Sequence, residues 1–192
     1  MSRPTLTAST VIRTAADLAD SSGLTAVTLS AVARELDVRT PSLYGHVRDL
    51  AALRDGITIL ALGELSDRAG EAVAGRARRD ALTALCEVHR DYARRYPGRW
   101  ESLQRRAGEA AVRSDEAARS SRALAAVLRG YGIAEEDRVH ATRLISSFLN
   151  GFLHLEHVGA FAHSAPSADE SWTPLIHRLD VLLTTWSEEA AP

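Results

Sequence analysis

Residues 28–47 have the sequence T-L-S-A-V-A-R-E-L-D-V-R-T-P-S-L-Y-G-H-V. The hydroxyl of Thr28 is suited to cap a helix. Apolar residues then recur at the spacing of one helix face, at Leu29, Val32, Ala33 and Leu36. Asp37 follows, and aspartate is among the few residues that tolerate the left-handed backbone of a tight turn. The pattern predicts a short helix that ends in a turn near Asp37.

A second helix is predicted directly after this turn. Thr40 followed by Pro41 is a strong helix start, with the threonine as cap and the proline in the first helical position. Leu43 and Val47, four residues apart, are placed to dock this helix onto the first. Tyr44 is expected at the edge of the buried side, and the residues expected to face outward are Ser42, Gly45 and His46.

This helix pair is typical of a helix-turn-helix, which inserts its second helix into the DNA major groove. An ordinary pair of helices with a solvated polar face would have the same spacing. The outward face favours DNA binding because it lacks glutamate and long charged side chains. Residues 38–48 also contain Arg39 and Arg48 but no acidic residue, which predicts a locally positive surface.

Residues 7–57, about a quarter of the chain, resemble the DNA-binding domain of the TetR family of bacterial transcriptional regulators. The resemblance rests on a first helix ending at Gly23, the run L-T-A-V-T-L, and P-S-L-Y-G-H-V-R-D before a long helix. It implies phosphate contacts from Thr28 and Tyr44, with Thr40 and Ser42 nearest the bases. The recognition helix implied by the resemblance carries Thr40, Pro41, Ser42, Tyr44, Gly45 and His46.

Two positions depart from the family's pattern. Asp37 stands where the family usually has a glycine in the turn, which a non-glycine residue tolerates with some strain. Leu50 stands where many members have a lysine that holds a phosphate. We therefore expect Arg39 or Arg48 to supply that contact.

The composition is that of a soluble globular protein, because 45% of the residues are hydrophobic and 25% are charged. The sequence has no apolar signal segment and no membrane span, so a cytoplasmic location is expected. All 23 basic residues are arginine, which we attribute to a GC-rich genome, and the net charge of −2 disfavours a general nucleic-acid coating protein. Cys86, the single cysteine, is expected to be a small buried side chain.

Helical patterns continue to the C-terminus, with no alternating strand pattern. Beyond the helix-turn-helix, helices are predicted over residues 8–22, 50–69 (with Asp49 as N-cap), 78–96, 100–107, 115–131, 136–161 and 172–187. The expected fold is all-α with about nine helices. A three-helix DNA-binding domain over residues 1–48 is joined to a larger ligand-binding and dimerisation domain over residues 49–192.

The last predicted helix carries an apolar stripe that needs a partner: Leu175, Leu179, Leu182, Leu183 and Trp186. The run N-G-F-L-H-L-E-H-V-G-A-F, residues 150–161, resembles one TetR subgroup, with asparagine in place of a histidine. The resemblance implies a homodimer formed through residues 136–161 and 172–187, and two-fold dimers are the commonest oligomers. Packing of the stripe within one subunit is the alternative.

The resemblance also implies a small-molecule pocket among the inner helices. Such a pocket needs an apolar wall with a few polar anchors, and the residues that can supply it are His89, Tyr92, Trp100, Phe148 and Phe152. Each of these is, taken singly, more typical of a core. No catalytic motif is present and no cofactor is expected. A metal site at His154, His157 and His163 is not expected either, because further ligands are lacking.

The predicted function is a TetR-like transcriptional repressor that binds a palindromic double-stranded DNA operator as a homodimer and is released by a small-molecule effector. A small all-α enzyme and a helical interaction module without DNA contact are the alternatives. The lack of a catalytic constellation disfavours the enzyme. The Thr40–Pro41 start and the exposed tyrosine favour DNA binding.

Overall fold

The computed structural model describes residues 6–189, with side chains described up to Trp186. Within this range the fold is all-α as predicted, with nine α-helices, two 3-10 helices and no strand. None of these helices is long and apolar enough to cross a membrane. The chain divides into two compact units. The first unit contains the residues up to Glu64 and Arg95–Ala118, and the second contains Leu65–Arg94 and the residues from Arg119 on.

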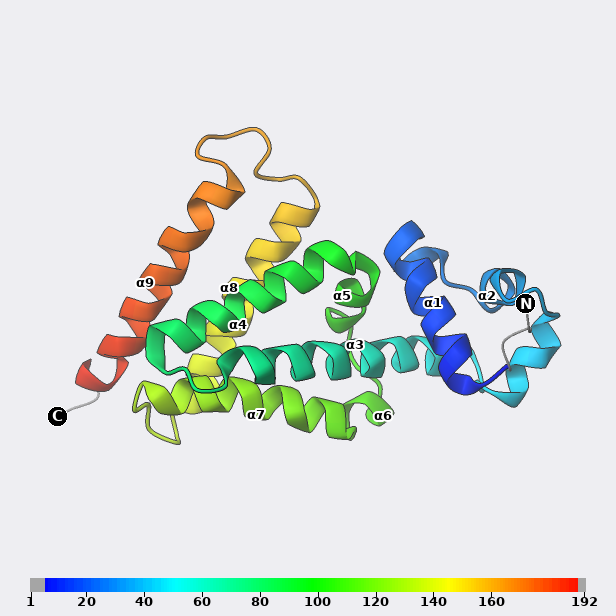
Figure 1. Ribbon diagram of the computed structural model, residues 1–192, viewed down its shortest axis with the longest axis horizontal. Helices are drawn as coiled ribbons and strands as arrows, with labels where there is room; N and C mark the ends of the chain where they lie inside the picture. Colours follow the sequence, from blue (N-terminus) through cyan, green and yellow to red (C-terminus); the bar gives the residue numbers. More distant parts are fainter. Residues whose placement is uncertain (1–5, 190–192) are drawn as a thin grey trace. The chain divides into compact units, whose positions relative to one another are not determined.

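The first unit begins with α1 (Ala8–Ser22), η1 (Leu24–Ala26), α2 (Leu29–Glu35) and η2 (Thr40–Gly45), drawn in blue and cyan in Figure 1. The predicted extent of α1 is confirmed, and Gly23 ends the helix with a φ of 83° that favours glycine. The core of this unit consists of small and branched side chains, including Val11, Ala15, Ala19, Val32, Leu43, Val47, Leu53 and Ile57.

The first unit also contains the first part of α3 (Leu50–Val73), α5 (Pro97–Leu103) and α6 (Glu109–Val112). α5 packs very closely on α1, because a Cβ atom at Gly98 would lie 2.1 Å from the carbonyl carbon of Ala19. Only glycine permits that approach. α5 is thereby fixed to α1, although the two helices are far apart in sequence.

The second unit contains the rest of α3, most of α4 (Arg78–Arg95), most of α7 (Asp115–Gly130), α8 (Arg138–His157) and α9 (Ala168–Glu189). An aromatic cluster joins its last two helices. Trp172 of α9 stacks on Phe148 of α8 with ring centroids 5.7 Å apart, and lies 4.9 Å from Phe152. The indole N–H of Trp172 donates to Glu87 of α4 at 2.9 Å. Trp172 therefore fixes the beginning of α9 against α4 and α8.

Several predicted helix boundaries are wrong by a few residues. α3 continues to Val73, and the chain turns at Gly75, which has a φ of 71°. α5 begins at Pro97, three residues before its predicted start, and α6 was not predicted. α8 ends at His157, before Gly159 with a φ of 74°.

The predicted start of α9 is also wrong, because the helix begins at Ala168. Ser167 and Glu170 form a reciprocal capping box there. The Ser167 hydroxyl accepts from the Glu170 N–H at 3.2 Å, and the Glu170 carboxylate accepts from the Ser167 N–H at 2.9 Å. This S-x-x-E signal was present in the sequence within a segment interpreted as a loop.

Candidate nucleic-acid interface and interior cavity

η2, the predicted recognition helix, is a 3-10 segment of six residues. Arg39 is its N-cap, with an extended backbone, and no side chain caps the helix. The expectation that Thr40 is the cap is therefore wrong. Thr40 and Pro41 occupy the first turn, where proline's missing N–H costs nothing. The preceding turn is as predicted, because Asp37 adopts a φ of 52°.

Two buried side chains, Leu43 and Val47, anchor η2 to the core as predicted. Tyr44 is 57% exposed, as the interpretation of this face as a DNA-binding surface requires, whereas His46 is half-buried and its expected outward placement is wrong. His46 lies three residues after the buried Leu43, and this spacing puts two residues on one face in a 3-10 helix and in an α-helix alike. Tyr44, the next residue after Leu43, points outward.

The rest of the outward face is formed by short side chains. Pro41, Ser42 and Gly45 are exposed, and a Cβ atom at Gly45 would meet nothing within 4 Å. Thr28 is exposed at the start of α2, where its hydroxyl accepts from the Ala31 N–H at 3.1 Å as predicted. The exposed face therefore has an uncrowded surface with one projecting aromatic ring.

The two arginines beside this face differ in their surroundings. The Arg48 guanidinium donates to Asp49 at 2.8 Å, and Asp49 also accepts from the Ala52 N–H at 2.7 Å as the cap of α3. The Ala52 N–H and then Arg48 lower the pKa of Asp49 below its ordinary value. Within residues 6–189 the Arg39 guanidinium is exposed and has no ion-pair or hydrogen-bond partner. Arg39 is therefore the cation that remains available to another molecule.

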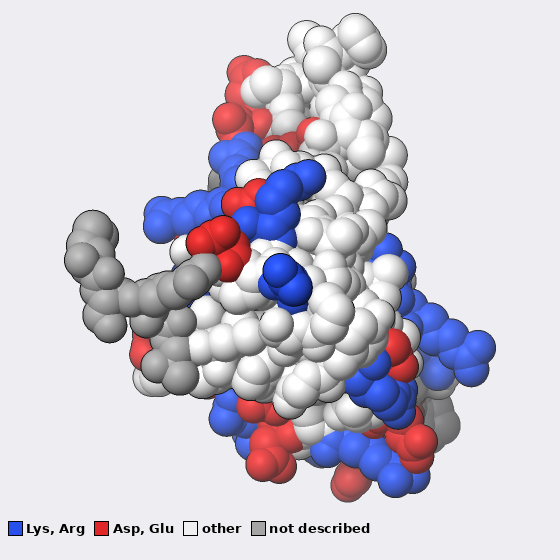
Figure 2. All heavy atoms as spheres, turned by 90° about the vertical axis from the view of Figure 1, so that its right-hand side faces the viewer, with Lys and Arg blue, Asp and Glu red and all other residues white. Residues whose placement is uncertain are grey.

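The charge on this end of the chain is mixed. Residues 6–48 contain four arginines and four acidic residues. Figure 2, which looks at the end that carries α1, α2 and η2, shows arginines and acidic residues around a broad uncharged area. The surface is therefore suited to specific contacts more than to a general attraction for phosphates.

A buried arginine supports the first unit from α5. The side chain of Arg99 is 9% exposed and forms ion pairs with Asp17 and Asp20 of α1 and with Glu64 of α3. Burial raises the pKa of Asp20, although hydrogen bonds from Arg99 and Gly98 oppose this effect. Sequence reasoning missed this cluster because its members are separated by up to 82 residues and follow no motif.

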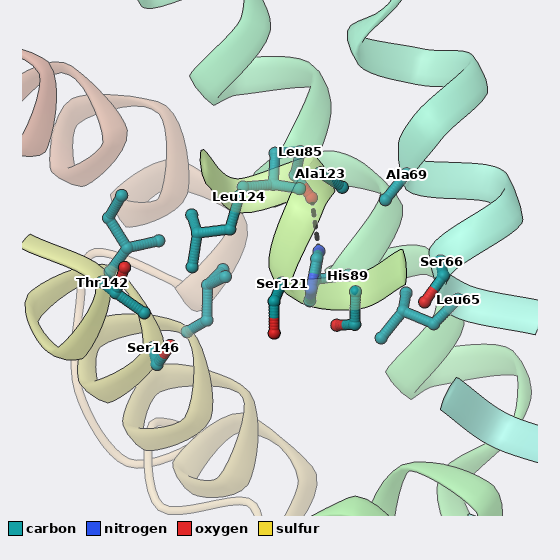
Figure 3. A pocket seen from close by; sticks show the side chains of 13 residues that line it. Leu65, Ser66, Ala69, Leu85, His89, Ser121, Ala123, Leu124, Thr142 and Ser146 are labelled. Carbon is teal, nitrogen blue, oxygen red and sulfur yellow. Dashed lines mark hydrogen bonds between the residues drawn. The ribbon is translucent and has the colours of Figure 1, made fainter. Parts of the chain in front are cut away.

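A cavity of about 250 Å³ lies among the helices of the second unit, with the exposed Ser121 in its wall (Figure 3). Its wall comes from one face each of α3, α4, α7 and α8. The residues that line it are Leu65, Ser66, Ala69, Leu85, His89, Ser120, Ser121, Ala123, Leu124, Thr142, Ile145, Ser146 and Leu149. On α8 these residues have the i, i+3, i+4, i+7 spacing of a single helix face. Hydroxyl groups on that apolar face were a signal that the sequence interpretation did not use.

His89 is the one residue from the predicted ligand set that lines this cavity. Its Nδ1 lies 2.7 Å from the carbonyl oxygen of Leu85, as the dashed line in Figure 3 shows. Because a carbonyl only accepts, Nδ1 carries the proton, and Nε2 is the acceptor nitrogen of the neutral ring. Burial lowers the pKa of His89 below its ordinary value, although the bond to Leu85 opposes this.

The structure places the other four predicted ligand residues away from the wall of this cavity. Tyr92 is fully buried, with the Arg68 guanidinium 5.3 Å from its ring centroid. Trp100 is buried in α5 of the first unit. Phe148 and Phe152 belong to the aromatic cluster around Trp172.

Two expectations about titratable side chains concern the second unit. Cys86 is fully buried as predicted, and burial raises the pKa of its thiol to about 12. His154, His157 and His163 are exposed. Across the part of the chain that the structure describes, no group of three or more His, Cys, Asp or Glu side chains is placed to hold a metal ion.

The apolar stripe predicted on α9 divides between two surroundings. Leu179 and Leu183 are buried within the subunit, as the alternative interpretation requires. Leu175 and Leu182 are 38% and 53% exposed. Further exposed apolar side chains on or next to α8 and α9 are Val139, Leu155, Val158 and Val181.

Comparisons with known proteins agree with this architecture. A family profile described as "Tetracyclin repressor-like, C-terminal domain" matches residues 82–179. The chain is 32% identical over 149 residues to the HTH-type transcriptional regulator YobS of Bacillus subtilis (strain 168), with 77% of each chain covered. It is 29% identical over 176 residues to the HTH-type transcriptional regulator Rv0681 of Mycobacterium tuberculosis (strain ATCC 25618 / H37Rv), covering 91% of this chain and 80% of that protein. The crystal structure of apo ActR from Streptomyces coelicolor has the same fold, with a TM-score of 0.75, 18% identity and 100% of both chains covered.

Proposed function

Because this chain belongs to the TetR family of transcriptional regulators, we propose that it is a repressor that binds a palindromic operator as a homodimer and is released by a small-molecule effector. The observation that carries this proposal is the outward face of η2. The buried side chains of Leu43 and Val47 anchor η2 to the core, and Tyr44 projects from an outward face of otherwise short side chains. Such a face fits the major groove without a steric or charge penalty.

The DNA contacts are proposed to come from one continuous surface. Ser42 and Thr40 lie nearest the bases, Tyr44 and Thr28 contact phosphates, and Gly45 allows close approach because the space around it is open. The complete proposed set is Thr28, Arg39, Thr40, Pro41, Ser42, Tyr44, Gly45, His46 and Arg48. In functional terms residues 1–48 bind the operator and residues 49–192 regulate that binding.

The effector is proposed to occupy the cavity of the second unit. Of the ligand residues predicted from the sequence we retain His89, because it combines a position in the wall with an acceptor nitrogen. The other contacts come from the residues that surround it in the wall.

The homodimer is proposed to form through the exposed apolar side chains of α8 and α9. Leu175 and Leu182 are seven residues apart and share one face of α9. Replacing both with glutamate would place unpaired carboxylates in the interface without disturbing the buried Leu179 and Leu183. Light scattering should show a dimer for the wild type and a folded monomer for this double variant. A wild-type monomer at micromolar concentration would contradict the dimer.

Operator binding is tested by fluorescence anisotropy with duplexes from the DNA upstream of the chain's own gene. We expect one duplex to bind in preference to a scrambled duplex, with two half-sites about 34–36 Å apart or slightly more. The Leu175→Glu/Leu182→Glu variant should lose this preference, because a monomer engages only one half-site. Equal affinity for operator and scrambled duplexes would overturn the proposed function.

A further inference from the structure

The wall of the cavity contains no formal charge. None of its 13 residues is Asp, Glu or Arg, and the chain has no lysine. Six of them carry a neutral hydrogen-bonding group: Ser66, Ser120, Ser121, Thr142, Ser146 and His89. The other seven are alanine, leucine and isoleucine. The wall includes the exposed Ser121, so a charged ligand would lose part of its hydration here, and it would gain no opposite charge in return.

His89 adds no charge to the cavity wall at neutral pH. Its Nδ1–H is directed to the Leu85 carbonyl, and burial disfavours the protonated ring. Nε2 of the neutral ring is an acceptor atom, whereas a hydroxyl group can act as donor or acceptor. In Figure 3 His89 lies beside Ser121, with Thr142 and Ser146 on one side and Ser66 on the other. Hydrogen-bonding groups therefore surround the space on more than one side.

The size of the cavity limits the ligand. Its volume of about 250 Å³ exceeds the roughly 150 Å³ that accommodates benzene in an engineered apolar cavity. It falls below the roughly 300–1,000 Å³ typical of pockets for drug-sized ligands. On the order of ten non-hydrogen atoms fit this space, by scaling from the benzene cavity.

We propose that this cavity binds a small uncharged molecule of on the order of ten non-hydrogen atoms, with an apolar body and hydroxyl or carbonyl groups. Its polar groups bond to the wall hydroxyls and to His89, and its body packs on Leu85, Leu124, Ile145 and Leu149. Its role as the effector rests on the proposed function. Carboxylates, phosphates and amines are excluded because the wall offers them no counter-charge.

Three aromatic probes of similar size separate the ligand classes: benzyl alcohol, benzoate and benzylamine, at pH 7.5. Each is titrated into the full-length protein carrying labelled isoleucine and leucine methyl groups. Benzyl alcohol should shift the methyl signals of Ile145 and Leu124, and benzoate and benzylamine should bind at least tenfold more weakly. Charged probes that bind within tenfold of the alcohol, with the same shifts, would overturn the proposal. Failure of all three to shift these signals would also overturn it.

Matched variants locate the site. Ser146→Leu fills the cavity from α8 and should abolish the alcohol-dependent shifts, whereas Ser147→Leu changes the adjacent exposed residue and should retain them. Ser121→Leu fills the cavity from a different helix, α7, so the site can still be tested if one of the two variants misfolds. Binding of benzyl alcohol that survives both cavity-filling variants would show that it does not bind in this cavity.

The effector role has its own readout. Operator affinity is measured with and without saturating benzyl alcohol. Binding in the cavity with unchanged operator affinity would uphold the chemical class of the site and contradict the effector part of the proposed function. Weaker operator binding supports both, since coupling requires different ligand affinities in the two states.

Discussion

The proposed DNA surface and the cavity are constructed in opposite ways. The nine residues of the surface lie within a single segment of 21 residues, 28–48, whereas the cavity wall is formed by four helices between Leu65 and Leu149. The turn at Asp37 and the buried side chains of Leu43 and Val47 position the surface, and packing between helices that are distant in sequence positions the cavity wall. Substitutions on the surface should therefore separate binding from stability, and substitutions among packed helices should couple them.

The largest expected effect tests this separation on the surface. Tyr44→Ala should weaken operator binding by about 1–3 kcal/mol per half-site, and therefore by about 2–6 kcal/mol for a dimer. Because Tyr44 is exposed, the free energy of unfolding should change by less than about 0.5 kcal/mol. Anisotropy titrations and urea unfolding measure the two quantities. Tyr44→Phe isolates the hydroxyl, and unchanged affinity in a folded Tyr44→Ala protein would remove η2 from the interface.

The sequence predicted most of this surface because its determinants are local. Asp37 adopts the expected left-handed turn, Thr28 caps α2, and Leu43 and Val47 are buried. The expected outward placement of His46 was wrong, because His46 lies three residues after the buried Leu43 and this spacing puts both on one helix face. The 3-10 form of the segment was also not predicted, since proline and glycine in a six-residue segment do not by themselves decide between a 3-10 helix and an α-helix.

The second prediction tests whether the proposed DNA surface is positioned by local sequence alone. Arg99 is distant from that surface in sequence, but it supports the unit that carries the surface. Arg99→Met should destabilise the first unit by about 3–5 kcal/mol, since Asp20 and Glu64 would keep poorly solvated charges without their partner. Arg99→Lys keeps the charge but loses the planar fork, so its loss should be intermediate. Urea unfolding followed by circular dichroism measures both variants. Wild-type stability in Arg99→Met would show that α1 and α5 do not need this ion cluster.

The cavity could not be predicted in the same way. Tyr92, Trp100, Phe148 and Phe152 were chosen for their chemical type. Tyr92, Trp100 and Phe152 are buried in the packed parts of their units, and the half-buried Phe148 stacks on Trp172. Serines and threonines were passed over because a hydroxyl on one helix is ordinary. These hydroxyl groups form part of a cavity only where four helix faces meet. Of the five residues predicted for a ligand site, His89 is the one that lines this cavity.

The third prediction concerns an ion cluster in the second unit. Arg90, with a 7% exposed side chain, and Arg94 both pair with Glu156 and with Asp169. Burial alone would raise the pKa of Glu156, but hydrogen bonds from the two arginines outweigh it and lower the pKa below its ordinary value of 4.5. The ionised carboxylate therefore stabilises the fold above pH 4.5, and this contribution is lost as the pH falls further.

Glu156→Gln should therefore cost about 1.5–3 kcal/mol of unfolding free energy at pH 7, the range for hydrogen bonds to charged groups. The difference from the wild type should shrink as the pH falls below 4.5. Urea unfolding at pH 7 and at acidic pH measures this change. The exposed Glu136→Gln is the matched control and should follow the wild type throughout. A difference that stays constant with pH would assign the effect of Glu156 to packing.

The smallest expected effect distinguishes two arginines on the same surface. Arg39 is exposed without a partner in residues 6–189, whereas Arg48 is paired with Asp49 at 2.8 Å. Each phosphate contact contributes about 0.9 to the slope of log affinity against log salt concentration. Arg39→Ala should therefore reduce this slope by about 0.9 per half-site. Arg48→Ala should reduce it less, because the Asp49 pair must break before Arg48 reaches a phosphate. Arg129→Ala, which removes an exposed arginine of α7, is the control and should leave the slope unchanged.

A reduction of the slope that is larger for Arg48→Ala than for Arg39→Ala would contradict this prediction. It would mean that DNA displaces Asp49 from Arg48, and that Arg48, not Arg39, replaces the phosphate contact missing at Leu50.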